Sequence, residues 1–122
     1  MKKIGIIIIT IIVFILGINI FNRDEVMLNI KNSTNEEINY LKLTYTGLKD
    51  DTSIPKINPN ENIKVKVNID KNFEEGSMKI YYLDEKNVKI ESTIIGYFQK
   101  GDRKTVNINI ARKDGNIEIL SD

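Results

Sequence analysis

An almost unbroken apolar run, Ile4 to Phe21, follows directly on Lys2 and Lys3. Ten of its eighteen residues are isoleucine. A helix rises about 1.5 Å per residue, so the run would span roughly 27 Å, close to the ~30 Å hydrocarbon core of a bilayer. In lipid the backbone must satisfy its own hydrogen bonds, which favours a helix even in this β-branched sequence. We therefore predict a transmembrane helix over residues 4–21, with anchoring side chains that include Ile4, Ile9, Phe14 and Phe21.

The run has three alternative interpretations. A charged start before an apolar run also suits a cleaved signal peptide, but no small-residue cleavage site precedes Phe21 and no cysteine permits lipoprotein processing. Lys2 to Ile6 is similar to the leader of type IV prepilins, which is cut after Gly, but Thr10 stands where that family has glutamate. A buried soluble helix would need a second helix to cover it. We expect an uncleaved anchor.

The charges flanking the run predict its orientation. Lys2 and Lys3 precede it, whereas Arg23 after it is offset at once by Asp24 and Glu25. Positive charge is retained on the cytoplasmic side. We therefore expect a cytoplasmic stub (1–3), a short linker (22–25) and an extracytoplasmic domain (26–122) in a single-pass protein of the cell membrane.

The composition excludes several classes of function. The chain carries 18 basic and 17 acidic residues without a basic stripe, so we expect no nucleic-acid partner. It has no histidine and no cysteine, which removes Ser-His-Asp and Cys-His nucleophile systems, histidine metal sites and disulfides. We therefore predict no enzyme activity and no cofactor. Frequent Ile, Lys and Asn are typical of an AT-rich, bacterial genome.

Alternation of apolar and polar residues, the pattern of a half-buried strand, recurs along residues 26–122. The alternation breaks at Ile94 and Ile95, where we expect a bulge. Pro55 and Pro59 indicate that residues 52–62 form an edge crossing or a connection between sheets. The expected strands, by residue number, are 26–31, about 38–46, 63–69, 78–83, 88–97, 106–110 and 117–119.

Seven or eight short strands without a soluble helix predict an all-β fold, an antiparallel β-sandwich. Turn signals support this, above all Asp114-Gly115, which favours a two-residue hairpin. The pattern resembles an immunoglobulin-like or fibronectin-III-like module, although the chain has neither a cysteine pair nor a tryptophan. A partly open barrel is the alternative architecture.

Acidic residues in predicted turns are the remaining candidates for chemistry. The stretch 70–76 begins like a calcium loop, but Glu75 stands where an EF-hand needs glycine, so we expect a solvated loop, with a weak calcium site as the alternative. Carboxylates that would pair for glycoside chemistry all fall in predicted turns, where acids are common for turn reasons. They are Asp50, Asp51, Glu74, Glu75 and Asp84.

Outward-facing aromatic residues are better candidates for a binding surface. If Met78, Ile80 and Tyr82 face the core, Tyr81 and Leu83 stand on the open face, and the same reasoning turns Tyr40 outward. Aromatic side chains with a polar tip are favoured at protein interfaces. Tyr40, Tyr81 and Leu83 are therefore the predicted partner surface, with ordinary cross-strand packing as the alternative.

The sequence thus favours a membrane-anchored, non-catalytic binding or accessory module. A membrane-bound immunity or inhibitor protein and a structural subunit of an envelope complex are the alternatives. The short linker 22–25 would hold the domain near the bilayer. Besides the lipid bilayer itself, we expect a protein partner at or near the membrane surface.

Overall fold

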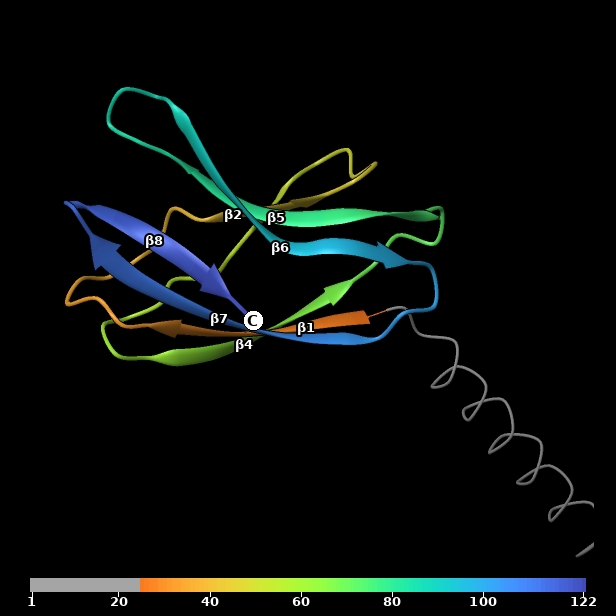
Figure 1. Ribbon diagram of the computed structural model, residues 1–122, viewed down its shortest axis with the longest axis horizontal. Helices are drawn as coiled ribbons and strands as arrows, with labels where there is room; N and C mark the ends of the chain where they lie inside the picture. Colours follow the sequence, from red (N-terminus) through yellow and green to blue (C-terminus); the bar gives the residue numbers. More distant parts are fainter. Residues whose placement is uncertain (1–24) are drawn as a thin grey trace, which may run out of the picture.

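The computed structural model describes residues 25–122, and within this range the secondary structure is eight strands without a helix (Figure 1). The predictions for residues 1–24 lie outside the described residues. From Glu25 onward there is accordingly no helix long and apolar enough to cross a membrane. The strands are β1 (Glu25–Asn32), β2 (Lys42–Tyr45), β3 (Thr52–Ser53), β4 (Asn62–Asn68), β5 (Glu75–Leu83), β6 (Lys89–Gln99), β7 (Lys104–Lys113) and β8 (Asn116–Ser121).

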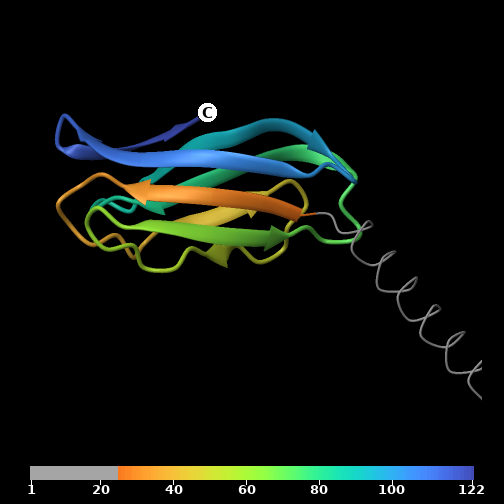
Figure 2. The ribbon, with the colours of Figure 1, turned by 90° about the horizontal axis from the view of Figure 1, so that it is seen from below.

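The strands form two four-stranded sheets, ordered β4-β1-β7-β8 and β3-β2-β5-β6, which lie one above the other in Figure 1. Figure 2 shows the first sheet in front of the second. The prediction of an all-β fold is thereby confirmed. The prediction of wholly antiparallel pairing is wrong at one place, because β1 pairs in parallel with β7, with Val26 opposite Lys104. Parallel neighbours need a long connection, and the whole second sheet lies between β1 and β7 in the chain. Apolar alternation carries no information on strand direction.

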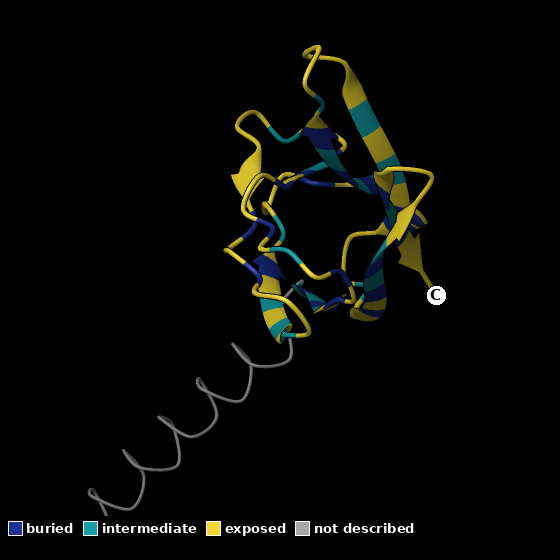
Figure 3. Ribbon diagram, turned by 90° about the vertical axis from the view of Figure 1, so that its left-hand side faces the viewer, coloured by how far each residue is buried: buried dark blue, intermediate teal, exposed yellow. Residues whose placement is uncertain are grey.

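One hydrophobic core lies between the sheets, and every strand except β3 buries apolar side chains in it (Figure 3). In β1 the buried apolar residues are Val26, Leu28 and Ile30, at every second position. The same period of two buries Met78, Ile80 and Tyr82 in β5, as predicted. Lys64 and Lys66 point outward from the edge strand β4, where charge discourages pairing with another chain.

The bulge in β6 and the β7–β8 turn confirm two local predictions. Met78 pairs with Ile95 and Lys79 with Thr93, so Ile94 is the extra residue that lets β6 bury both isoleucines. Lys113 pairs with Asn116, leaving Asp114 and Gly115 as a two-residue turn with φ of 54° and 84°. Both dihedrals are those of the hairpin turn that Asp-Gly favours.

Strand β2 is shorter than the predicted 38–46, because the chain before it is held by a buried asparagine. Asn32 is fully buried, and its amide nitrogen donates to the carbonyls of Glu36, Ile57 and Asn58 at 2.8, 3.0 and 3.2 Å. Its oxygen accepts from the N–H and hydroxyl of Thr34 at 2.9 and 2.6 Å. We call this arrangement the Asn32 knot.

The knot ties the loop after β1 to the connection that contains the prolines. Ile38 makes only an isolated bridge to Ile57, and both side chains are buried. The connection itself contributes the two-residue edge strand β3, in keeping with the edge crossing that the prolines predict.

The end of the domain where β1 begins is filled by aromatic rings, and we call it the packed end. The rings of Phe73 and Phe98 stack with centroids 4.5 Å apart, and Tyr45 meets Phe73 edge-on at 5.7 Å. The Tyr45 hydroxyl accepts a hydrogen bond from the backbone N–H of Asp70 at 3.1 Å. All three rings are buried, so the loop between β4 and β5 is fastened onto the core.

Candidate binding groove

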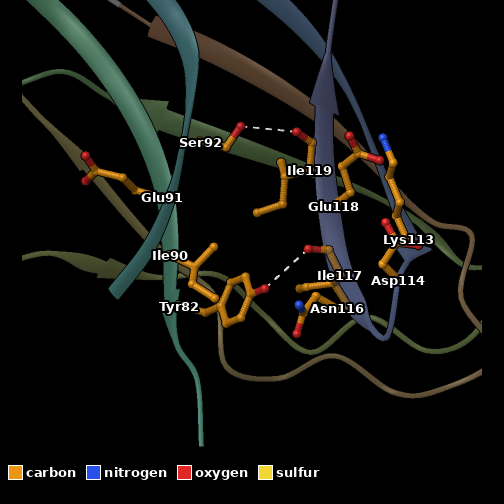
Figure 4. Close-up of a pocket in the computed structure, with 10 residues that line it drawn as sticks. All are labelled: Tyr82, Ile90, Glu91, Ser92, Lys113, Asp114, Asn116, Ile117, Glu118 and Ile119. Carbon is orange, nitrogen blue, oxygen red and sulfur yellow. Dashed lines mark hydrogen bonds between the residues drawn. The ribbon is translucent and has the colours of Figure 1, made fainter. Parts of the chain in front are cut away.

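Two adjoining hollows, of about 600 and 440 Å³, lie between the β5–β6 hairpin and the β7–β8 hairpin. They share Tyr82, Asn116 and Ile117, and we call them together the hairpin groove. They lie at the end of the domain where β1 finishes, opposite the packed end, and this is called the groove end. Figure 4 shows the smaller hollow, with β6 on one side and β8 on the other.

The smaller hollow runs along the edges of two strands. Its walls include the consecutive residues Ile90, Glu91 and Ser92 of β6 and the consecutive stretch 116–119 of β8. Since neighbouring side chains in a strand point to opposite faces, a hollow that touches consecutive residues must follow the strand edge. The groove therefore occupies the flank where β6 and β8 are the outermost strands of their sheets.

Two side chains from the second sheet bridge this flank. The Tyr82 hydroxyl donates to the carbonyl of Ile117 at 3.2 Å, and the Ser92 hydroxyl donates to that of Ile119 at 3.1 Å (Figure 4). Both acceptors are on β8, an edge strand whose outward carbonyls would otherwise be open to another chain. The bridges hold the two sheets together and give the groove a fixed floor.

A pair of tyrosines forms the apolar centre of the larger hollow. The ring of Tyr40 meets that of Tyr82 edge-on, with centroids 5.6 Å apart. Burial raises the pKa of the Tyr40 hydroxyl, and the nearby Glu36 carboxylate raises it further. Burial likewise raises the pKa of Tyr82, with a smaller contribution from Asp84. Both hydroxyls are therefore protonated, neutral donors at physiological pH.

Arg112 lies in the wall of the same hollow and is held by its neighbours. Its guanidinium pairs with the carboxylate of Glu36 and donates to the carbonyl of Gly115 at 3.0 Å. The hydrogen bond to Glu36 raises the pKa of Arg112, so its charge is permanent. The pair joins the loop after β1 to the β7–β8 hairpin across the mouth of the groove.

The structure brings two of the three predicted surface residues together. Tyr40 and Leu83 line the larger hollow, with exposed fractions of 39% and 55%. Tyr81 lies elsewhere, on the outer face of the β3-β2-β5-β6 sheet, where its hydroxyl donates to Asp51 and Lys89 Nζ stands 4.4 Å from the ring centroid. The hydrogen bond to Asp51 raises the pKa of Tyr81 and lowers that of the Asp51 carboxyl.

The residues that complete the groove were not expected from the sequence. Tyr82 was predicted to face the core, which it does, but its ring also forms the groove floor. The signal for this was its place near the end of the predicted strand 78–83, close to Asp84 in a predicted turn. Arg112 and Ile117 carry no such signal, because only the fold brings the β7–β8 hairpin to this place.

The acidic stretch 70–76 begins with a turn and runs into β5 at Glu75. The Asp70 carboxylate accepts a hydrogen bond from the Asn72 N–H at 2.9 Å, as in other Asx turns. Among residues 25–122 no group of three or more potential metal-ligating side chains occurs. Of the other candidate carboxylates, Glu75 accepts from the Tyr97 hydroxyl at 3.0 Å, and Asp84 from the Lys86 and Val88 N–H groups at 2.8 and 2.9 Å.

A smaller hollow, of about 330 Å³, lies at the packed end over Tyr45 and Phe73. Both of these side chains are buried, and the rest of its wall consists of polar residues and a glycine. By contrast, three of the exposed large apolar side chains described in the domain, Tyr40, Leu83 and Val88, gather at the groove end. The hairpin groove is therefore the stronger candidate for a binding site.

No family model matches the sequence, and no curated protein matches it. One solved structure is similar in fold, described as the NMR structure of the protein from Eubacterium rectale. It is 13% identical, covers 81% of this chain and 87% of its own, and superposes with a TM-score of 0.49. A similarity at this level does not indicate a shared function.

Proposed function

We propose that this chain is a single-pass membrane protein whose extracytoplasmic domain binds a protein partner through the hairpin groove. The observation that carries the proposal is the groove itself, a concavity of about 600 Å³ with an aromatic floor and an exposed leucine at its rim. Concave sites with an apolar floor and a few polar groups are the usual form of binding sites. The apolar run 4–21 of the sequence supports the membrane anchor.

We propose an immunoglobulin-like or fibronectin-III-like β-sandwich as the finer class of the domain. Its size of about a hundred residues and its two sheets over one core support this assignment. In such sandwiches the loops gather at two ends, and one end serves as the binding surface. The hairpin groove occupies an end of this kind.

In this proposal, the direction of β1 places the groove at the end of the domain that is farther from the membrane. An anchor before Glu25 would enter the domain at the packed end, and β1 then runs eight residues toward the groove end. At about 3.3 Å per residue, the groove would stand roughly 25 Å farther from the bilayer. The partner is accordingly a protein at the membrane surface that presents its bound segment above the lipid headgroups.

Matched leucine substitutions in living cells test the proposal. Leu83 and Leu120 are both exposed, at 55% and 47%, but only Leu83 lines the groove. Full-length, C-terminally tagged chains carrying Leu83→Asp or Leu120→Asp would be crosslinked in the cell and their partners identified by mass spectrometry. External protease would report the side of the membrane on which the tag lies.

We expect one partner that is lost with Leu83→Asp and retained with Leu120→Asp, and a tag that external protease removes. A partner captured equally by both variants would contradict the groove as the binding site. A tag that stays protected in intact cells, but is cut after lysis, would contradict the extracytoplasmic location.

A further inference from the structure

The charges around the hairpin groove are unbalanced, although the chain as a whole is not. The sequence has 17 acidic and 18 basic residues, so no general acidity explains the groove. Acidic residues in its walls nonetheless outnumber basic ones by seven to three. The basic residues are Lys86, Arg112 and Lys113. An acidic wall attracts cations and repels anions as they approach.

The one arginine side chain in the groove walls, Arg112, is already paired within the domain. Arg112 is paired with Glu36 and bonded to the Gly115 carbonyl, so an incoming carboxylate would have to displace an internal one. Several acids, by contrast, are free to meet a cation: within residues 25–122, no salt bridge joins Glu85, Asp114 or Glu118 to a basic side chain. Glu37 adds a further charge and meets only the half-exposed Lys56, at 3.3 Å.

The floor of the groove suits the stem of a long basic side chain. Tyr40 provides an exposed aromatic surface, backed by the buried ring of Tyr82, and a cation is attracted to the face of such a ring. Lysine and arginine lay their methylene groups on apolar surface while the charged head reaches polar groups at the rim. Leu83, exposed beside the tyrosines, offers a contact for an apolar neighbour in the same segment.

We propose that the partner segment held by the hairpin groove is basic and apolar in alternation, with lysine or arginine reaching the acidic rim and an aliphatic side chain against Leu83. This inference rests on the proposed function, because it names the chemistry of the partner at the same groove. Charge complementarity of this kind gives an interface its specificity and its association rate.

Binding of synthetic peptides to the full chain in phosphatidylcholine nanodiscs tests the inference. The probe is a fluorescent six-residue peptide of alternating lysine and leucine, followed by anisotropy. Its counterparts replace every lysine with glutamate or every leucine with serine. The groove variant is Glu37→Gln with Glu85→Gln, and the matched control is Asp50→Asn with Glu74→Gln, two exposed acids in the loops at the packed end.

We expect only the lysine–leucine peptide to bind the natural chain well. The same peptide should bind the groove variant about tenfold more weakly, which is the size of effect expected for two exposed charge contacts. The control variant should bind as the natural chain does. The inference is overturned if the glutamate or serine peptide binds as tightly, if both variants behave alike, or if the lysine–leucine peptide does not bind. Those results would leave the Leu83-dependent capture of a partner in cells unaffected, so the two proposals fail separately.

Discussion

At the packed end of the domain, Phe73 stacks on Phe98 and both rings are buried, whereas at the groove end Tyr40 and Tyr82 meet over an open hollow. Both ends thus use a pair of rings, but only at the groove end is one of the two rings exposed, that of Tyr40 at 39%. The difference indicates a division of roles, in which the packed end supplies stability and the groove end supplies binding. The predictions on Phe98, Asn32 and Tyr82 test that division, and the one on Tyr81 tests the separation of the groove from the outer face of the sheet.

The largest effect on stability is expected from Phe98→Ala. Phe98 is 1% exposed and stacks on Phe73, so its removal leaves a cavity and should lower the free energy of unfolding by about 3–5 kcal/mol. Urea denaturation of the full chain would measure this. Tyr97→Ala, at the exposed neighbour, should change it by less than about 1 kcal/mol. Equal losses from the two variants would mean that the packed end does not stabilise the domain in this way.

The second largest loss of stability is expected from Asn32→Ala, because the Asn32 knot fastens the loop after β1 at the groove end to the 57–58 connection. The change leaves buried carbonyls of the 57–58 connection without their donor, and we expect a loss of about 2–3 kcal/mol. Thr34→Val removes only one hydroxyl of the knot and should cost about 1 kcal/mol. If Asn32→Ala cost no more than Thr34→Val, the groove end would owe little to this asparagine.

Tyr82→Phe isolates the hydroxyl that bridges the two sheets. Its bond to the Ile117 carbonyl is 3.2 Å long and buried, so its loss should cost about 1 kcal/mol while the ring keeps its place. Ser92→Ala, which removes the second bridge, should have a similar effect. Thermal unfolding would measure both. A change in the free energy of unfolding smaller than about 0.3 kcal/mol in both variants would show that the two hydroxyl bridges do not stabilise the contact between the sheets.

The smallest expected effect is on the pKa of Tyr81. The pKa values of Tyr81 and Tyr82 are both raised, but for different reasons. The hydrogen bond to Asp51 raises the pKa of Tyr81, whereas burial raises that of Tyr82. Asp51→Asn should therefore lower the pKa of Tyr81 toward its ordinary value and leave that of Tyr82 unchanged. Tyrosinate absorbance followed against pH, with Tyr81→Phe to assign the step, would measure this. A shift of the Tyr82 step instead would contradict the separation of the two environments.

The same hydrogen bond sets the sign of a pH dependence. The pKa of Asp51 is lowered in the folded chain, so its contribution is complete above about pH 4, the ordinary value, and is lost as pH falls through the folded value. The pKa of Tyr81 is raised, so its contribution is complete below about pH 10 and is lost as pH rises through the folded value. Asp51→Asn should weaken the dependence of folding stability on pH both in the acid range and in the alkaline range.

Much of the fold follows from alternation in the sequence. Period-two burial in β1 and β5, the bulge at Ile94 and the Asp114-Gly115 turn were all predictable, because each depends on neighbouring residues. The parallel pairing of β1 with β7 was not, because it depends on where a distant hairpin returns. The early start of β2 was predicted wrongly, since Asn32 holds the nearby Glu36 carbonyl together with the distant Ile57 carbonyl, and the alternation does not reveal that contact.

The candidate site was predictable only in part, for a related reason. Tyr81 and Leu83 share a face of an ideal strand, so the sequence grouped them together. In the structure β2 pairs with β5 only from Met78 to Tyr81, and beyond that point β5 has lost this neighbour. Tyr40 packs in the space that is left, against Tyr82, and Leu83 borders it. The larger hollow of the groove therefore lies where the pairing of β2 with β5 ends, which the pattern of β5 alone does not reveal.

Photo-crosslinking at the two ends tests the division of roles most directly. A photoreactive residue would replace Leu83 at the groove end or Tyr97 in β6 beside Phe98 at the packed end, since these side chains are 55% and 58% exposed. In cells that express the full chain, we predict one discrete crosslinked partner from position 83 and none from position 97. The same partner crosslinked equally well from both positions, or from position 97 alone, would contradict the claim that binding belongs to the groove end.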